Sequence, residues 1–305
     1  MVREREIVLD GRRLALLECG AHPGGETATL LLLHGLGGCA RHWLQVLPAL
    51  GERSRVVALD LPGFGRSQPI AGTVSLERIV DVLAAAVSTL GLGPVVVVGH
   101  SFSGPVAIRF AAAHPDAAAG VALIGGGVFQ FSALLGLRRM RWFMRHRARS
   151  TLAIGAEALG AGLPLPPAAR RAIARSAWLR QALLWPYVST PRGLSAEAAA
   201  LLLDGVGAPG VRAVVRAVGG SDPLQGIERV GCPVLSIAGA RDLIVPLADT
   251  EELARAVPGL RSVVLEGCGH MVMLERPAQL VRELSEFACI CSSNERSESE
   301  LFSQQ

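Results

Sequence analysis

The chain has 305 residues, half of them hydrophobic, and a formal net charge of +4 at pH 7. It contains no Lys, so a catalytic, Schiff-base or P-loop lysine is excluded. The charge is too small to predict nucleic-acid binding, and the length suits one α/β core with an insertion.

The N-terminus and the cysteines favour a cytoplasmic protein. Residues 1–10, MVREREIVLD, are charged and lack the apolar core of a secretory signal. The six cysteines are scattered without the spacing of a zinc site or a disulfide framework. We therefore expect a reducing, cytoplasmic setting and no metal site.

Short apolar runs predict eight strands. They lie at 7–9, 14–19, 29–34, 55–60, 95–99, 120–125, 233–239 and 261–266. Helical patterns occur between the later runs and after the last, at 76–90, 101–113, 249–256 and 277–287. Apolar runs separated by helices are typical of a mostly parallel sheet covered by helices on both faces. The first two runs, joined at Asp10-Gly11, predict an antiparallel hairpin at one edge.

The alternation of strands and helices stops between about residues 128 and 230. Helix formers, Arg and Ala dominate there. We predict a helical cap over 128–230, inserted after the sixth strand and mounted on a core made of 1–127 and 231–291. Residues 292–305 are polar and acidic, which predicts a disordered tail.

Two charge-free runs, 82–108 and 117–137, are long enough to suggest membrane spans. Glycine-rich breaks interrupt both, which favours a strand followed by a helix or loop. An arginine-rich segment follows the second run, and a solvated helix face is the simplest interpretation. The alternatives are an anchored membrane protein and a weak membrane-surface contact through four arginines, Arg138, Arg139, Arg141 and Arg145.

The segment Gly99-His100-Ser101-Phe102-Ser103 differs by one residue from the G-x-S-x-G pattern of a nucleophile elbow. In such an elbow the chain turns sharply after a strand and lifts the serine above the sheet, so the flanking positions must be small. Gly99 and Ser103 are both small. Ser101 is therefore the candidate nucleophile, and the helix that follows directs backbone N–H groups towards developing negative charge.

A serine hydroxyl also needs a base that a third group orients. Asp242 follows the seventh predicted strand and His270 follows the eighth. Both are expected at the carboxyl edge of the sheet, where open α/β sheets meet their ligands. Ser101, Asp242 and His270 also occur in the chain order of such a site.

Taken together, these motifs resemble the α/β-hydrolase fold, and the resemblance extends to about Phe287. Residues 34–38, HGLGG, match the oxyanion loop of that family, and residues 60–67, DLPGFGRS, match the turn after its fourth strand. The resemblance implies an oxyanion hole formed by the backbone N–H groups of Leu36 and Phe102. The residues expected to support the site are His34, Gly35, Gly99 and His100.

Serine at position 101 predicts attack on a carbonyl carbon, whereas related enzymes with Asp at this position form an alkyl-enzyme ester. We expect a cofactor-independent serine hydrolase that cleaves a carboxylic ester, thioester or lactone with a hydrophobic part. The alternatives are a hydrolase of the C–C bond in β-diketone-like ring-cleavage products and a non-hydrolytic ligand-binding protein. Oligomeric state has no signal in the sequence.

The cap offers apolar side chains that suit an acyl chain or a ring. They are Phe129, Phe131, Leu134, Leu135, Trp142, Phe143, Met144, Trp178, Leu183, Trp185 and Tyr187. The same side chains could instead hold the cap helices together.

Overall fold

The computed structural model describes residues 1–20, 27–126, 152–153, 156, 160, 162–219, 222 and 225–303. Its centre is an eight-stranded sheet in the order β1-β2-β4-β3-β5-β6-β7-β8. The strands are β1 (Arg3–Leu9), β2 (Arg12–Cys19), β3 (Thr29–Leu33), β4 (Val56–Leu59), β5 (Val95–His100), β6 (Ala118–Ile124), β7 (Val234–Gly239) and β8 (Arg261–Leu265). The mostly parallel sheet predicted from the sequence is confirmed, with antiparallel pairing only at β1–β2 and β2–β4.

The edge hairpin turns where the sequence predicted. Asp10 has a φ of 48° and Gly11 a φ of 73°, and a two-residue type I′ turn needs positive φ at both central positions. This turn starts the sheet with one antiparallel pair before the parallel strands.

Helices cover the sheet on both faces. Those of the core are α1 (Leu47–Leu50), α2 (Leu76–Thr89), α3 (Ser103–Ala113), α11 (Leu247–Ala256), α12 (Val272–Glu275) and α13 (Pro277–Ser303). Along β3, Leu30 and Leu32 join the apolar cluster that contains α1 and α13, while Leu31 and Leu33 join the cluster that contains α2 and α3. Successive strand side chains point to opposite faces, so the strand is buried on both sides in a three-layer arrangement.

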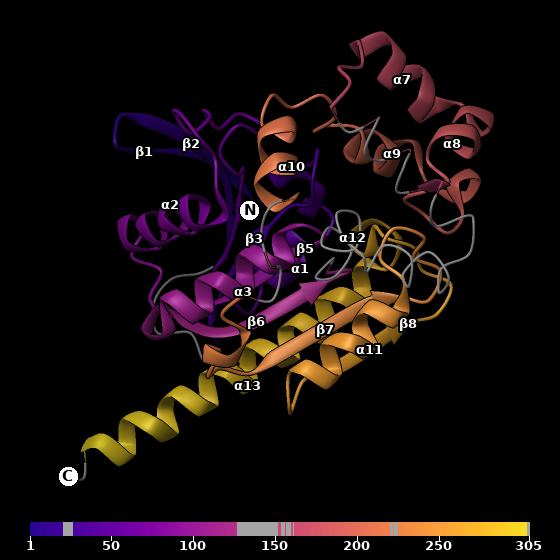
Figure 1. Cartoon of the computed structure of the whole chain (residues 1–305). Helices are drawn as coiled ribbons and strands as arrows, with labels where there is room; N and C mark the ends of the chain where they lie inside the picture. The colour runs from indigo at the N-terminus through magenta and orange to yellow at the C-terminus, as the bar shows by residue number, and fades with distance from the viewer. Residues whose placement is uncertain are drawn as a thin grey trace.

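The described residues between β6 and β7 contain helices and no strand. These helices are α7 (Pro167–Arg175), α8 (Ala177–Leu183), α9 (Ala196–Leu202) and α10 (Val211–Gly219). Figure 1 shows α7, α8 and α9 beyond the ends towards which the strand arrows point. The cap boundaries 128 and 230 stay a prediction, and Arg138, Arg139, Arg141 and Arg145 lie outside the described residues.

Two helices differ from the sequence expectation. Helix α3 begins at Ser103 instead of Ser101, because Ser101 has a φ of 53° and cannot belong to a right-handed helix. Helix α13 continues to Ser303 through the segment predicted as a disordered tail, since neither Gly nor Pro follows Pro277 to stop it. Figure 1 shows its last turns extending away from the body of the molecule. Among the described residues, no helix combines the length and apolar character needed to cross a bilayer.

Close packing at Gly205, between α9 and α10, gives a test of how this region sits on the core. A Cβ at Gly205 would lie 2.6 Å from Cα of Gly38, in the loop after β3. We expect Gly205→Ala to lower the free energy of unfolding by about 1 to 3 kcal/mol, because backbone must move. Urea denaturation measures the change. Gly193→Ala is the control, because its Cβ would have no atom nearer than 3.7 Å, and equal stability of the two variants would contradict the packing.

Candidate active site

Ser101 occupies the tight turn between β5 and α3. Its φ of 53° is a left-handed conformation, which costs a non-glycine residue about 1 to 2 kcal/mol. The N–H of Ser101 donates to the carbonyl of Ile124 (3.0 Å), and its carbonyl accepts from the N–H of Gly104 (2.9 Å). The turn therefore has the strand–turn–helix geometry of a nucleophile elbow, held in a strained conformation by its neighbours.

Gly99 and Ser103, the two small residues on either side of Ser101 in the elbow, contribute to its structure in different ways. A Cβ at Gly99 would lie 2.7 Å from the carbonyl carbon of Ser103, so only glycine fits there without a shift of the backbone. Ser103 is fully buried, and its hydroxyl donates a hydrogen bond of 2.6 Å to the carbonyl of His34. The residue that departs from the G-x-S-x-G pattern thus fastens the elbow to the loop after β3.

That loop, residues 34–38, packs directly against the elbow. The ring of His34 is bonded at both nitrogens: Nδ1 donates to the carbonyl of Gly35 (2.8 Å), and Nε2 accepts from the N–H of Leu61 (3.1 Å). Burial lowers the pKa of His34 to about 4, so the ring is neutral. A Cβ at Gly35 would lie 2.7 Å from Nδ1 of His100 and 3.2 Å from Cβ of Ser101, so this position requires glycine.

Asp242 and His270 meet beyond the ends of β7 and β8. Nδ1 of His270 lies 2.8 Å from Oδ2 of Asp242, and both side chains are buried. The other carboxylate oxygen, Oδ1, accepts from the backbone N–H groups of Ile244 and Val245, each at 2.8 Å. The carboxylate is therefore fixed in position. Its hydrogen bond with His270 places the imidazole proton on Nδ1, so Nε2 keeps an unprotonated lone pair.

His100 supports the histidine loop. Its Nε2 donates to the backbone carbonyl of His270 at 3.1 Å, and the two ring centroids are 4.7 Å apart. Glu275, which the sequence did not single out, holds the same loop by accepting from the backbone N–H of Gly269 (2.9 Å). A glutamate six residues after a loop glycine carries no signal that sequence reasoning could have used.

A cavity of about 320 Å³ opens between the sheet edge and the helices α7, α8 and α9. Five of the predicted site residues form part of its wall, namely Ser101, His270, His100, Leu36 and Gly35, whereas Asp242, Phe102, His34 and Gly99 do not line it. The other described residues that line it are mostly apolar, with no Asp, Glu or Arg among them. They are Gly37, His42, Ala156, Gly160, Leu163, Leu165, Ile173, Ala182, Leu183, Leu184, Trp185, Pro186, Tyr187, Leu202, Leu203, Val206 and Met271.

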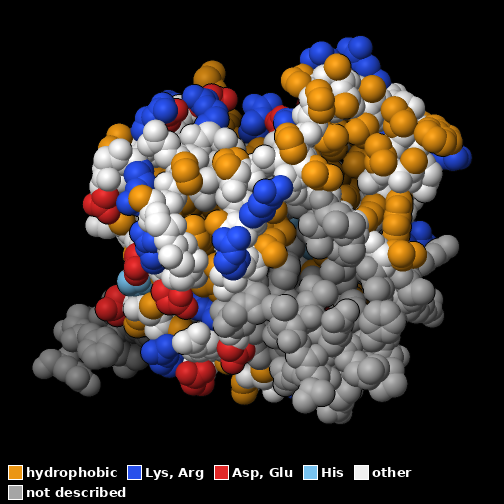
Figure 2. All heavy atoms as spheres, turned by 45° about the horizontal axis from the view of Figure 1, so that its top comes forward, with side chains coloured by type: hydrophobic (Ala, Val, Ile, Leu, Met, Phe, Trp, Pro, Cys, Tyr) orange, Lys and Arg blue, Asp and Glu red, His pale blue; other side chains and the backbone are white. Residues whose placement is uncertain are grey.

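The apolar cap residues divide into two groups. Leu183, Trp185 and Tyr187 line the cavity, whereas Trp178 has 67% of its surface exposed. Figure 2 shows hydrophobic side chains also gathered on the outer surface of the cap helices, at the upper right. The remaining seven predicted residues, Phe129, Phe131, Leu134, Leu135, Trp142, Phe143 and Met144, lie outside the described residues. In the described part of the chain no cluster of His, Cys, Asp and Glu is arranged to hold a metal ion.

Residues 30–283 match the sequence model of the alpha/beta hydrolase family. This chain belongs to that family. The (E)-2-((N-methylformamido)methylene)succinate hydrolase of Acinetobacter baylyi is 27% identical over 259 residues, which cover 84% of this chain and 88% of the relative. The pimeloyl-(acyl-carrier protein) methyl ester esterase of Nitrosomonas europaea is 28% identical over 269 residues, covering 84% and 94%.

A solved structure, the thermophilic esterase of Thermogutta terrifontis, shares the fold of this α/β hydrolase. The TM-score is 0.69 at 23% identity, and the match covers 95% of this chain and 99% of the esterase. The two relatives are named for different substrates, so the family identifies a hydrolase and leaves the substrate class open.

The bond from Ser103 to the oxyanion loop can be tested by removing its hydroxyl. We expect Ser103→Ala and Ser103→Gly each to lower the free energy of unfolding by about 1 kcal/mol, because both lose the buried hydrogen bond to the His34 carbonyl. Chemical denaturation measures the change. A Ser103→Gly variant as stable as the native chain would show that the hydrogen bond from the Ser103 hydroxyl does not stabilise the folded state.

Asp249 is a buried carboxyl next to this site, in the first turn of α11. Burial, with the charges of Glu252 and Asp242, raises the pKa of Asp249 to about 7, and its Oδ2 has no hydrogen-bond partner in the described part of the chain. The pKa of Asp249 in the folded state lies above its unfolded value of 3.8, so protonation of this carboxyl stabilises the folded state. This contribution to stability is complete at low pH and is lost as the pH rises towards 7.

We therefore expect Asp249→Asn to raise the free energy of unfolding at about pH 8, by up to about 4 kcal/mol, and to change it little at about pH 4. Urea denaturation at the two pH values measures the difference. An equal effect at both would mean that this carboxyl does not titrate between them.

Proposed function

We propose that this α/β hydrolase is a serine hydrolase that cleaves a carboxylic ester, or a related thioester or lactone, with a hydrophobic part. One observation carries the proposal: His270, which is hydrogen-bonded to the buried Asp242, lines the same cavity as Ser101. A base fixed by a buried carboxylate and a serine on a strained elbow are the parts that acyl transfer needs.

The first half of the reaction acylates the serine. Oγ of Ser101 attacks the carbonyl carbon of the ester, and Nε2 of His270 takes the hydroxyl proton. Asp242 stabilises the imidazolium through Nδ1. His270 then gives the proton to the leaving alkoxide, the ester C–O bond breaks, and the acyl group stays on Ser101.

The oxyanion is bound by the backbone N–H groups of Leu36 and Phe102. Neither amide donates a hydrogen bond within the described residues, so both are available to a ligand. Gly35 and Ser103 support this arrangement, because they keep the loop against the elbow. Preorganised donors of this kind are worth about 100-fold or more in rate.

The second half releases the acid. Water enters after the alcohol leaves, His270 takes one of its protons, and the hydroxide formed attacks the acyl carbon. Collapse of this second tetrahedral intermediate breaks the bond to Ser101, which recovers its proton from His270. No external oxidant, reductant or cofactor enters this sequence.

The lining of the cavity favours an ester over the alternatives. A ring-cleavage product carries a carboxylate, and no arginine is among the described lining residues to pair with it. A protein that only binds ligands has no need of a buried pair like Asp242 and His270. The helical region over 128–230 acts as the cap that covers the acyl group, and the scattered spacing of the cysteines suits a reducing, cytoplasmic setting.

Labelling with a fluorophosphonate probe tests the proposal. We expect the native chain and the surface control Ser88→Ala to be labelled, and Ser101→Ala and His270→Ala to be unlabelled. With p-nitrophenyl esters, kcat should fall about 10⁴-fold or more in Ser101→Ala and Asp242→Asn, because nucleophile and base act as a unit. A folded native chain that neither reacts with the probe nor hydrolyses esters would falsify the proposal.

A further inference from the structure

His42 is a buried histidine whose ring meets the cavity without a hydrogen-bond partner. It lies in the short 3-10 helix η1 (Ala40–Trp43), and only 5% of its surface is exposed. Neither Nδ1 nor Nε2 is hydrogen-bonded within the described residues. The carbonyl of Leu202 is near enough to raise the pKa of His42, but its geometry does not complete a hydrogen bond to either nitrogen.

The contrast with His34 shows that burial alone does not explain why the ring nitrogens of His42 lack hydrogen-bond partners. His34, eight residues earlier, satisfies both of its nitrogens within the protein. A buried polar group left unpaired destabilises the folded state, so an unpaired ring that faces a cavity points to a ligand. Burial lowers the pKa of His42 to about 4, so the ring is neutral and offers one N–H donor and one nitrogen acceptor.

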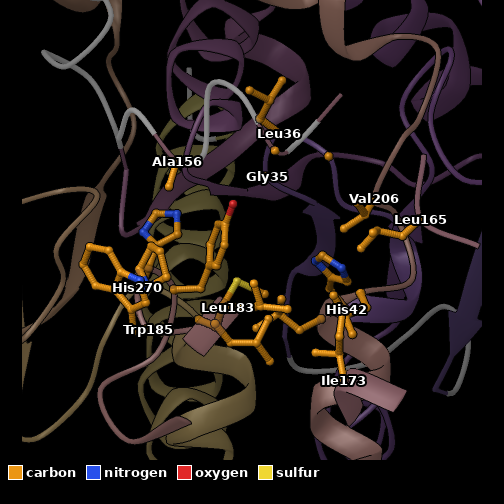
Figure 3. A pocket seen from close by; sticks show the side chains of 18 of the residues that line it. Gly35, Leu36, His42, Ala156, Leu165, Ile173, Leu183, Trp185, Val206 and His270 are labelled. Atoms are coloured by element: carbon orange, nitrogen blue, oxygen red, sulfur yellow. The ribbon is translucent and has the colours of Figure 1, made fainter. Parts of the chain in front are cut away.

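The surroundings of His42 define what the ring can recognise. Figure 3 shows it on the side of the cavity where Leu165, Val206 and Ile173 lie, across from His270 and Trp185. These neighbours are apolar, which favours an alkyl or aryl group with one polar atom. A neutral imidazole in such a place suits a hydroxyl, which both donates and accepts, better than a carboxylate, which needs a cation.

We propose that His42 forms a polar subsite that hydrogen-bonds a neutral oxygen, best a hydroxyl, on the hydrophobic part of the ester and remote from the scissile bond. This inference rests on the proposed ester hydrolysis, and it makes His42 a specificity-determining residue rather than a catalytic one. The preferred substrate class is then hydroxylated acyl or alkyl esters over plain ones.

Matched substrates test the subsite. We would compare p-nitrophenyl hexanoate with analogues that carry a hydroxyl at successive positions along the chain. The native chain should favour at least one hydroxylated ester by about 10-fold or more in kcat/KM, because the plain ester leaves the imidazole unpaired. His42→Leu should lose this preference and hydrolyse the plain ester faster than the native chain does. His42→Gln keeps a donor and an acceptor and should retain part of the preference.

Two further measurements separate this role from a structural one. Ile173→Leu, which reshapes an apolar wall on the same side, should change kcat/KM for both esters alike. His42→Leu should raise Tm by about 2 °C or more in the absence of ligand, since it removes an unpaired buried group. A histidine that only supported the fold would give a lower Tm and no change in the preference between the two esters.

The outcomes distinguish failure of this inference from failure of the proposed function. If the native chain hydrolyses all the esters with equal kcat/KM, or if His42→Leu keeps the preference, the subsite is overturned and the hydrolase stands. If no ester is hydrolysed, the hydrolase is overturned, and calorimetric titration of the intact esters then decides about His42. Tighter binding of a hydroxylated ester that disappears in His42→Leu supports the subsite, and equal binding overturns it.

Discussion

The close approach of backbone at the β5–α3 turn is the constraint on which the rest of the site depends. Ser101 is held in a left-handed conformation, and neither Gly99 nor Gly35 has room for a Cβ. The loop after β3 can therefore lie against the turn, and the Ser103 hydroxyl fastens the two together. Any residue that widened this contact would move the loop after β3 away from Ser101.

The sequence predicted the candidate site residues best where these residues follow the end of a strand. The elbow and Asp242 follow the buried strands β5 and β7, and His270 follows the partly exposed edge strand β8. A parallel sheet brings such strand ends to one edge whatever the intervening chain does. The eight strands could also be predicted, because each apolar run is short and has clear limits in the sequence. Helix limits were harder, because the start of α3 depends on the backbone strain at Ser101.

The sequence could not predict which apolar residues of the helical region line the cavity, because these residues have several possible partners. Leu183 lines the cavity and is nevertheless half exposed, while Trp178, five residues earlier, is mostly exposed. Which face of a short helix meets a ligand depends on how neighbouring helices pack, and that is not encoded locally. His34 and His42 make the same point: they lie eight residues apart, and whether each ring finds hydrogen-bond partners depends on the three-dimensional structure.

The neutrality of the cavity also governs what happens after the reaction. Burial keeps the rings of His42 and His100 uncharged, and the described lining contains no Asp, Glu or Arg. In the proposed mechanism, a carboxylic acid released from Ser101 would ionise at neutral pH, and an unpaired anion is unfavourable in such surroundings. For the ester proposed above, the substrate is a neutral, apolar molecule and the product is an ion with poor affinity for this lining. In the proposed reaction, the lining that admits the substrate would therefore favour release of the product and limit product inhibition.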